Sequence, residues 1–97
     1  MTLIPDDIRK RIEHDFGSEG TKRVTAALEQ FIESYQSNYS ARPSDRIIRC
    51  IIHLAQGKLD LLSHHTKAAL GDWRDVIYWA EYDRKDERTH DFRLPFK

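Results

Sequence analysis

The chain has 97 residues, enough for one small domain. Its 16 basic and 16 acidic residues give a formal net charge of zero, which argues against binding nucleic acids or membranes through an excess of positive charge. A single cysteine excludes an internal disulfide and suits a reducing compartment. The first seven residues lack the basic and apolar regions of a secretory signal. We therefore expect a soluble, cytoplasmic, single-domain protein.

Apolar residues recur with a helical period along nearly the whole chain, and the alternation typical of strands is nowhere sustained. Prolines, glycines and polar caps divide this pattern into segments, as Pro5 and Gly17 do around the first of them. The sequence therefore predicts an all-α fold, a compact bundle of about five helices followed by an extended apolar C-terminal tail. The helices are expected over residues 5–16, 20–36, 45–56, 58–70 and 73–82, and the tail over residues 84–97.

The third helix is expected to lie at the centre of the bundle. Ser44 is a good N-cap for it, and Gly57 can end it. Its apolar side chains cover more than half of the circumference, which is typical of a helix with neighbours on two sides. They are Ile47, Ile48, Ile51, Ile52, Leu54 and Ala55. Cys50 lies among them, and this apolar setting predicts an unreactive thiol.

The tail begins with a mixed-charge stretch, residues 84–90, which has no apolar residue and is expected to be exposed and mobile. Phe92, Leu94 and Phe96 then alternate around Pro95. Three large apolar side chains near a chain end are costly to leave in water. We expect them to dock into a groove between helices.

The fifth helix has the most unusual composition, because four of the ten aromatic residues lie within residues 73–82. Trp73, Ile77 and Ala80 share the face expected to be buried, whereas Trp79 and Tyr78 lie on two other faces. Trp, Tyr and Arg dominate the binding energy of protein interfaces, which favours a partner surface. An ordinary core helix with aromatic residues at its edge is the alternative. The predicted partner-binding residues are Arg74, Tyr78, Trp79, Tyr82, Phe92, Leu94 and Phe96.

Two other kinds of binding site are weaker alternatives. Arg42, Arg46 and Arg49 lie on or just before the polar side of the third helix, and they are the best candidates for contacts with nucleic acid. His64, which follows Asp60 by four residues on one helical face, and His65 are candidates for a small-molecule or metal site, although no third metal ligand is indicated. His65 is surrounded by leucines and alanines, which favours a core histidine with one hydrogen bond to the backbone.

Motifs of the common enzyme classes do not occur in the sequence. It has no phosphate-binding loop, nucleotide fingerprint, serine elbow or paired-histidine metalloprotease motif. No glycine-rich turn that could form an oxyanion hole accompanies Cys50. We therefore expect neither enzymatic activity nor a cofactor or metal.

Parts of the second half resemble known sequences. The run from Arg46 to Tyr82, above all DWRDVIYWAEY at residues 72–82, resembles small bacterial proteins of unknown function, and so does the closing DFRLPF at residues 91–96. This resemblance implies a bacterial, cytoplasmic origin and a helical fold, and it transfers no functional residue. Taken with the aromatic helix, the sequence predicts a non-enzymatic protein-interaction module that binds another protein or forms a homodimer.

Overall fold

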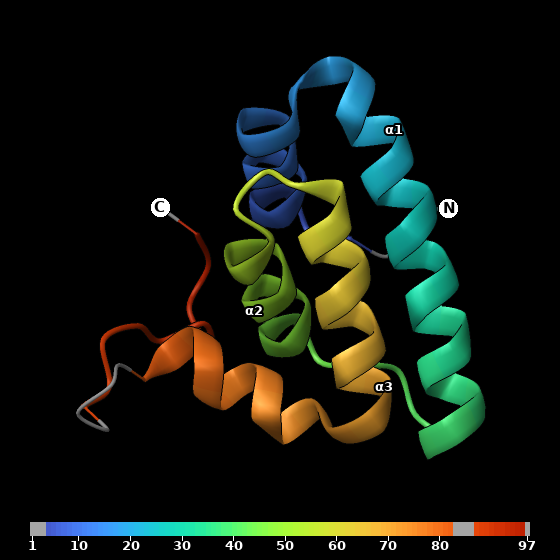
Figure 1. Ribbon diagram of the computed structural model, residues 1–97, viewed down its shortest axis with the longest axis vertical. Coiled ribbons are helices and arrows are strands. Elements are labelled where there is room, and N and C mark those ends of the chain that lie inside the picture. The colour runs from blue at the N-terminus through green and yellow to red at the C-terminus, as the bar shows by residue number, and fades with distance from the viewer. Residues whose placement is uncertain (1–3, 83–86, 97) are drawn as a thin grey trace.

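The computed structural model describes residues 4–82 and 87–96. These residues form three helices, α1 (Asp6–Tyr39), α2 (Asp45–Ala55) and α3 (Leu59–Glu81), and a single isolated β-bridge between Tyr82 and Arg88 (Figure 1). The molecule is compact, with extents of 37 × 31 × 24 Å. The prediction of an all-α fold is therefore confirmed, but the expectation of about five helices is wrong, because the described chain has three.

The difference in helix number comes from two bends. Gly17, with φ of 74° and ψ of 175°, interrupts α1, and Asp72, with φ of −152° and ψ of 101°, interrupts α3. In each case the helix resumes after one non-helical residue, and its axis changes direction there (Figure 1). Asp72 caps the helical turn that follows it, since its Oδ1 accepts a hydrogen bond from the Arg74 N–H at 3.1 Å. We refer to residues 6–16 and 18–39 as the two segments of α1, and to residues 59–71 and 73–81 as those of α3.

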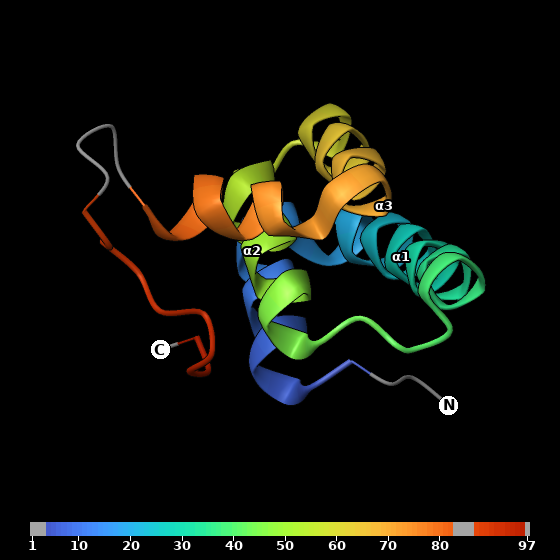
Figure 2. The ribbon, with the colours of Figure 1, turned by 90° about the horizontal axis from the view of Figure 1, so that it is seen from below.

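The isoleucine-rich helix α2 lies in the middle of the molecule, as predicted (Figure 2). Its N-cap is Ser44, whose Oγ accepts a hydrogen bond from the Ile47 N–H at 3.3 Å. Gln56 and Gly57 end the helix in the left-handed conformation. Ile48, Ile51 and Ile52 have no exposed surface and pack against residues from both other helices. The β-branched helix is thus stabilised by tertiary packing.

Residues 87–96 form an irregular C-terminal segment beside α2 and the first segment of α1 (Figures 1 and 2). Phe92 is only 6% exposed and belongs to the core, and Phe96 packs partly against it. Leu94 is 58% exposed, so the expectation that all three apolar side chains dock is wrong for this residue. Residues 84–86 of the predicted mobile stretch, and Lys97, lie outside the described residues.

No helix of the described chain combines the length and the apolar character needed to cross a membrane.

Candidate functional site

Glu81, near the end of α3, is a fully buried carboxylate that joins three parts of the chain. Its oxygens accept hydrogen bonds from Arg46 Nε at 2.8 Å, Arg46 Nη2 at 2.7 Å and Arg88 Nη2 at 2.8 Å. The Phe92 N–H donates to Oε2 at 3.2 Å, and the Thr89 N–H donates to the Glu81 carbonyl at 2.7 Å. Burial raises the pKa of Glu81, but the arginines outweigh it, and the pKa lies below its ordinary value. Glu81 therefore fixes the start of the C-terminal segment to α2 and α3.

Arg49 forms a second ion pair that fixes the end of the same segment. This guanidinium is 7% exposed, and it donates from Nε to Asp7 Oδ2 at 2.9 Å and from Nη2 to Asp7 Oδ1 at 3.2 Å. Its Nη1 donates to the Phe92 carbonyl at 3.2 Å, and the Phe96 N–H donates to Asp7 Oδ2 at 3.0 Å. Burial acts to raise the pKa of Asp7, yet Arg49 holds it below its ordinary value. The C-terminal segment thus docks on its own chain.

These ion pairs also account for the arginines proposed to contact nucleic acid. Arg46 binds Glu81, Arg49 binds Asp7, and Arg42 Nη1 lies 3.2 Å from Asp45 Oδ1. Each positive charge is therefore balanced within the chain, and the Arg49 side chain is nearly inaccessible to solvent. The arrangement counts against a nucleic-acid surface on α2, which stays an untested alternative.

Four of the predicted partner-binding residues lie together on the second segment of α3 and at its C-cap, Tyr82. Tyr78 is 47% exposed and Trp79 is 46% exposed, and the ring of Tyr82 stacks on that of Tyr78 with centroids 5.4 Å apart. Arg74, one turn earlier, is exposed and binds Asp72 through Nε and Nη2, each at 3.1 Å. We call Arg74, Tyr78, Trp79 and Tyr82 the aromatic face.

The remaining predicted partner-binding residues lie elsewhere. The ring of Phe92 packs on that of His53 with centroids 4.9 Å apart, and Phe96 lies under the guanidinium of Arg11 at 4.8 Å. Leu94, between them, is exposed. The predicted set is therefore divided between the aromatic face and the C-terminal segment, which packs against α2 and the first segment of α1.

His64 and His65 lie beside the aromatic face. Their rings are 4.9 Å apart, and the ring of His65 meets that of Trp79 edge-on at 6.0 Å. The buried Nδ1 of His65 has no hydrogen-bond partner among the described residues, whereas the sequence predicted a bond to the backbone. Burial lowers the pKa of His65, and His64 lowers it further. Within residues 4–82 and 87–96, no three His, Cys, Asp or Glu side chains gather closely enough to hold a metal ion.

Cys50 is buried in α2, as the sequence predicted. Burial raises the pKa of its thiol to about 12, with a smaller contribution from the negative charge of Glu81. The reactive thiolate is therefore not formed at neutral pH.

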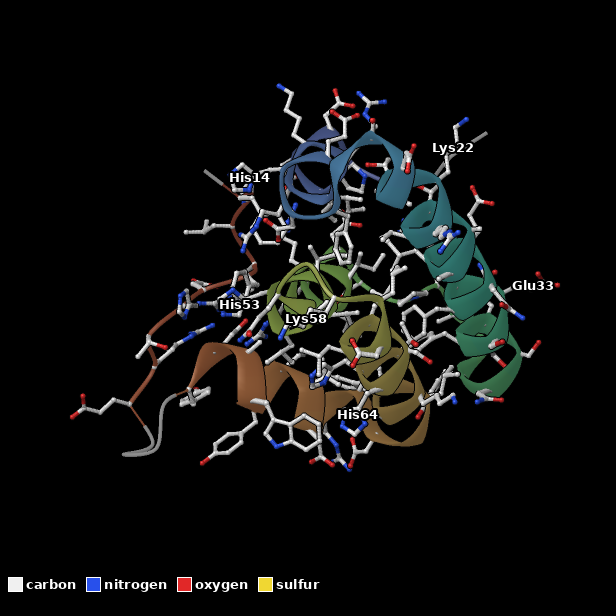
Figure 3. The ribbon with its side chains drawn as sticks, turned by 45° about the horizontal axis from the view of Figure 1, so that its top comes forward. His14, Lys22, Glu33, His53, Lys58 and His64 are labelled. Atoms are coloured by element: carbon white, nitrogen blue, oxygen red, sulfur yellow. The ribbon has the colours of Figure 1, made fainter. Side chains whose placement is uncertain are left out.

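A groove that sequence reasoning missed runs between the first segment of α1, the end of α2 and the C-terminal segment. Three adjoining cavities, of about 560, 430 and 500 Å³, all have Arg11 in their walls. Figure 3 shows His14 and His53 on the side of the molecule that the C-terminal segment passes. These residues come from three separate elements, so no sequence motif could have indicated them. We call the site the Arg11 groove; it is lined mainly by Arg11, His14, Asp15, His53, His90 and Phe96.

Comparisons with protein-family models, with curated proteins and with solved structures find no match to this chain. The resemblance to small bacterial proteins therefore stays a prediction.

Proposed function

We propose that this protein is an interaction module that binds another protein through the aromatic face of α3. The observation that supports this proposal is the exposure of two neighbouring aromatic side chains, Tyr78 at 47% and Trp79 at 46%, on a helix whose other side is in the core. Exposed clusters of large apolar side chains are typical of binding surfaces. Trp, Tyr and Arg are also the residues that contribute most to interface energies.

The aromatic face is held in place before a partner binds. Val76 and Ala80 anchor this segment of α3 in the core, and Glu81 ties its end to Arg46. The stacked rings of Tyr78 and Tyr82 restrict each other's side-chain freedom. A partner would therefore lose little free energy to ordering this surface, and aromatic side chains in particular have few rotatable bonds to fix.

The position of the C-terminal segment favours a partner from outside the chain, because the segment packs on α1 and α2 and not on the aromatic face. Its contacts to Arg49 and Asp7 hold Phe92 and Phe96 against α2 and α1. Tyr78 and Trp79 keep nearly half of their surface exposed with the segment in place. A second protein, or a second copy of this chain, is then the occupant that would bury them.

Site-specific photo-crosslinking tests this proposal. Asp75 is exposed and precedes Trp79 by one helical turn, so a benzophenone amino acid there would sample the aromatic face without removing its rings. The matched control places the same probe at Glu33, which is exposed on the outer side of α1 (Figure 3).

We expect a discrete crosslinked product from position 75 in cells, and none from position 33. The product should be lost with Trp79→Ser and retained with Leu59→Ser, which changes an exposed apolar residue outside the aromatic face. A product of twice the chain mass would identify a homodimer. Identical products from both probe positions, or a product that Trp79→Ser does not affect, would overturn the proposal.

A further inference from the structure

The Arg11 groove contains an arginine that is held in place yet keeps one edge open. Arg11 Nε donates to Asp15 Oδ2 at 2.9 Å, and the ring of Phe96 lies 4.8 Å from the guanidinium carbon. Neither Nη atom of Arg11 donates a hydrogen bond to any residue in the described chain. By contrast, Arg46, Arg49 and Arg74 each bind a carboxylate through two nitrogens. An arginine fixed through Nε presents its two Nη atoms as a preformed donor pair for an oxyanion.

Three carboxylates line the groove, and each is already paired with an arginine: Asp7 with Arg49, Asp15 with Arg11, and Asp91 with Arg88 and Arg93. Asp15 Oδ1 lies 2.9 Å from Nδ1 of His14, and its Oδ2 accepts from Arg11, while its side chain is only 11% exposed. Asp15 therefore positions Arg11 and His14, and the positive charge of Arg11 compensates the negative charge of Asp15. Further along the groove, the rings of His53 and His90 are 4.7 Å apart and line the same cavity.

The apolar part of the groove comes from the C-terminal segment. Phe96 lines the cavity beside His14, and Phe92, Leu94 and Pro95 line the cavity beside His53. The hydrogen bonds from Arg49 to the Phe92 carbonyl and from the Phe96 N–H to Asp7 fix this wall. The groove thus offers a cationic end and an apolar wall on a rigid frame, as sites for small ligands do.

We infer that the Arg11 groove binds a small organic anion, in which a phosphate or carboxylate head meets Arg11 and His14 while an apolar or aromatic body lies along Phe96 and Leu94. This site shares no residue with the aromatic face, and it does not depend on the proposed partner.

Protonation of His53 would strengthen binding of such an anion. The charged and titratable groups around His53 are Arg11, His14 and Asp15 from α1 and His90 and Asp91 from the C-terminal segment, and the ring of Phe92 packs on it. Burial and the positive charges of His90 and Arg11 keep the pKa of His53 below its ordinary value, and the charge of a bound anion would oppose this effect. Binding should therefore be tighter at about pH 6 than at about pH 8, with His53 taking up a proton.

The test uses the full chain and three probes, phenyl phosphate, benzoate and inorganic phosphate, followed by two-dimensional NMR at constant ionic strength. We expect saturable shifts of the Arg11, His14 and His53 signals with phenyl phosphate or benzoate, and weaker binding of inorganic phosphate because it has no apolar body. Whichever of phenyl phosphate and benzoate binds with the higher affinity identifies the head group as a phosphate or a carboxylate. Shifts that do not saturate, or equal affinity for phenyl phosphate and inorganic phosphate, would overturn the inference.

Matched variants separate the groove from general charge effects. Arg11→Gln should weaken binding at least about tenfold, because charge-assisted hydrogen bonds are lost. Arg9→Gln removes an exposed cation from the same helix outside the groove and should leave the affinity unchanged. His14→Gln, at a side chain that is 82% exposed, should weaken binding about fivefold without affecting the fold. An equal loss in the Arg9 and Arg11 variants, or full affinity in His14→Gln and Arg11→Gln, would contradict the site.

Discussion

At the scale of single residues, Glu81 stabilises the fold through four hydrogen bonds to its carboxylate. Glu81→Gln keeps the shape of the side chain but leaves Arg46 and Arg88 without their buried counter-charge. Because breaking one side of a buried ion pair strands the other, we expect a loss of about 2–4 kcal/mol in the free energy of unfolding, measured by urea denaturation. Glu33→Gln, at an exposed position of α1, is the control and should change the free energy of unfolding little. Equal stability of the two variants would show that the Glu81 ion pairs contribute nothing.

The role of Glu81 could not have been predicted from its surroundings in the sequence. Helical periodicity places it on the same polar face as Arg74 and Tyr78, which are both exposed. Glu81 is buried because Arg46, which is 35 residues away, and the C-terminal segment cover it. The sequence placed the two arginines of α2 on the polar side of that helix, but Arg49 is buried, and the acidic partners of both arginines are distant in sequence. Long-range ion pairs leave no periodic signal.

At the scale of elements, the turn from α2 to α3 depends on Gly57. Its φ is +75°, and a Cβ atom there would lie 2.6 Å from the carbonyl oxygen of Asp15, a backbone atom that cannot easily move. Gly57→Ala should therefore destabilise the protein by at least about 2 kcal/mol, from left-handed strain and from the clash with α1. Thermal unfolding followed by circular dichroism would measure this change.

Gly71 provides the control for Gly57. It lies within α3, and a Cβ atom there would meet nothing within 4 Å. Gly71→Ala should thus be stabilising by about 0.5–1 kcal/mol, since alanine favours the helix. If both alanine variants lowered the stability equally, the close approach of Gly57 to Asp15 would not be the cause.

Local signals predicted the ends of α2 but not the number of helices. Ser44 and Gly57 act through neighbouring residues, and the expected range 45–56 differs from Asp45–Ala55 by one residue. Gly17 and Asp72 do adopt non-helical conformations where helix ends were expected. Whether a helix stops or resumes after such a residue depends on what the next turn packs against. That packing is a tertiary property, and composition does not show it.

At the scale of the whole molecule, four buried or partly buried groups make stability depend on pH. Burial and nearby positive charge lower the pKa of His53 and His65 in the folded protein. As the pH falls below about 6.5, these histidines are therefore protonated in the unfolded chain before they are protonated in the folded one, and the folded state loses stability. Burial acts to raise the pKa of Asp7 and Glu81, but the neighbouring arginines lower it by more, so both values lie below their ordinary range. Near pH 4 the unfolded chain therefore binds more protons than the folded chain, and the folded state loses stability as the pH falls. The free energy of unfolding should therefore decrease in two steps from pH 8 to pH 3.

Urea midpoints measured across this range would check the two steps. His53→Gln should reduce the first decrease and leave the second unchanged, because it removes only one group that is neutral in the folded protein. A midpoint that stays constant or rises between about pH 7 and pH 5 would contradict the neutral, partly buried state of these histidines.

The arrangement of the whole chain rests on one feature, the docking of the C-terminal segment on α1 and α2, which leaves the aromatic face open. Removal of residues 92–97 from a Trp73→Phe background tests it, because Trp79 is then the only tryptophan. We expect the melting temperature to fall by roughly 10 °C or more, since a buried phenylalanine and its hydrogen bonds are lost.

Acrylamide quenching of Trp79 fluorescence, compared between the intact and the shortened chain below the melting temperature of both, is the most direct measurement. Trp79 is already 46% exposed with the segment in place, so we predict the same quenching in both chains. A clear increase in quenching after truncation would mean that the segment covers the aromatic face in solution, and the proposed partner surface would then be the protein's own intramolecular contact.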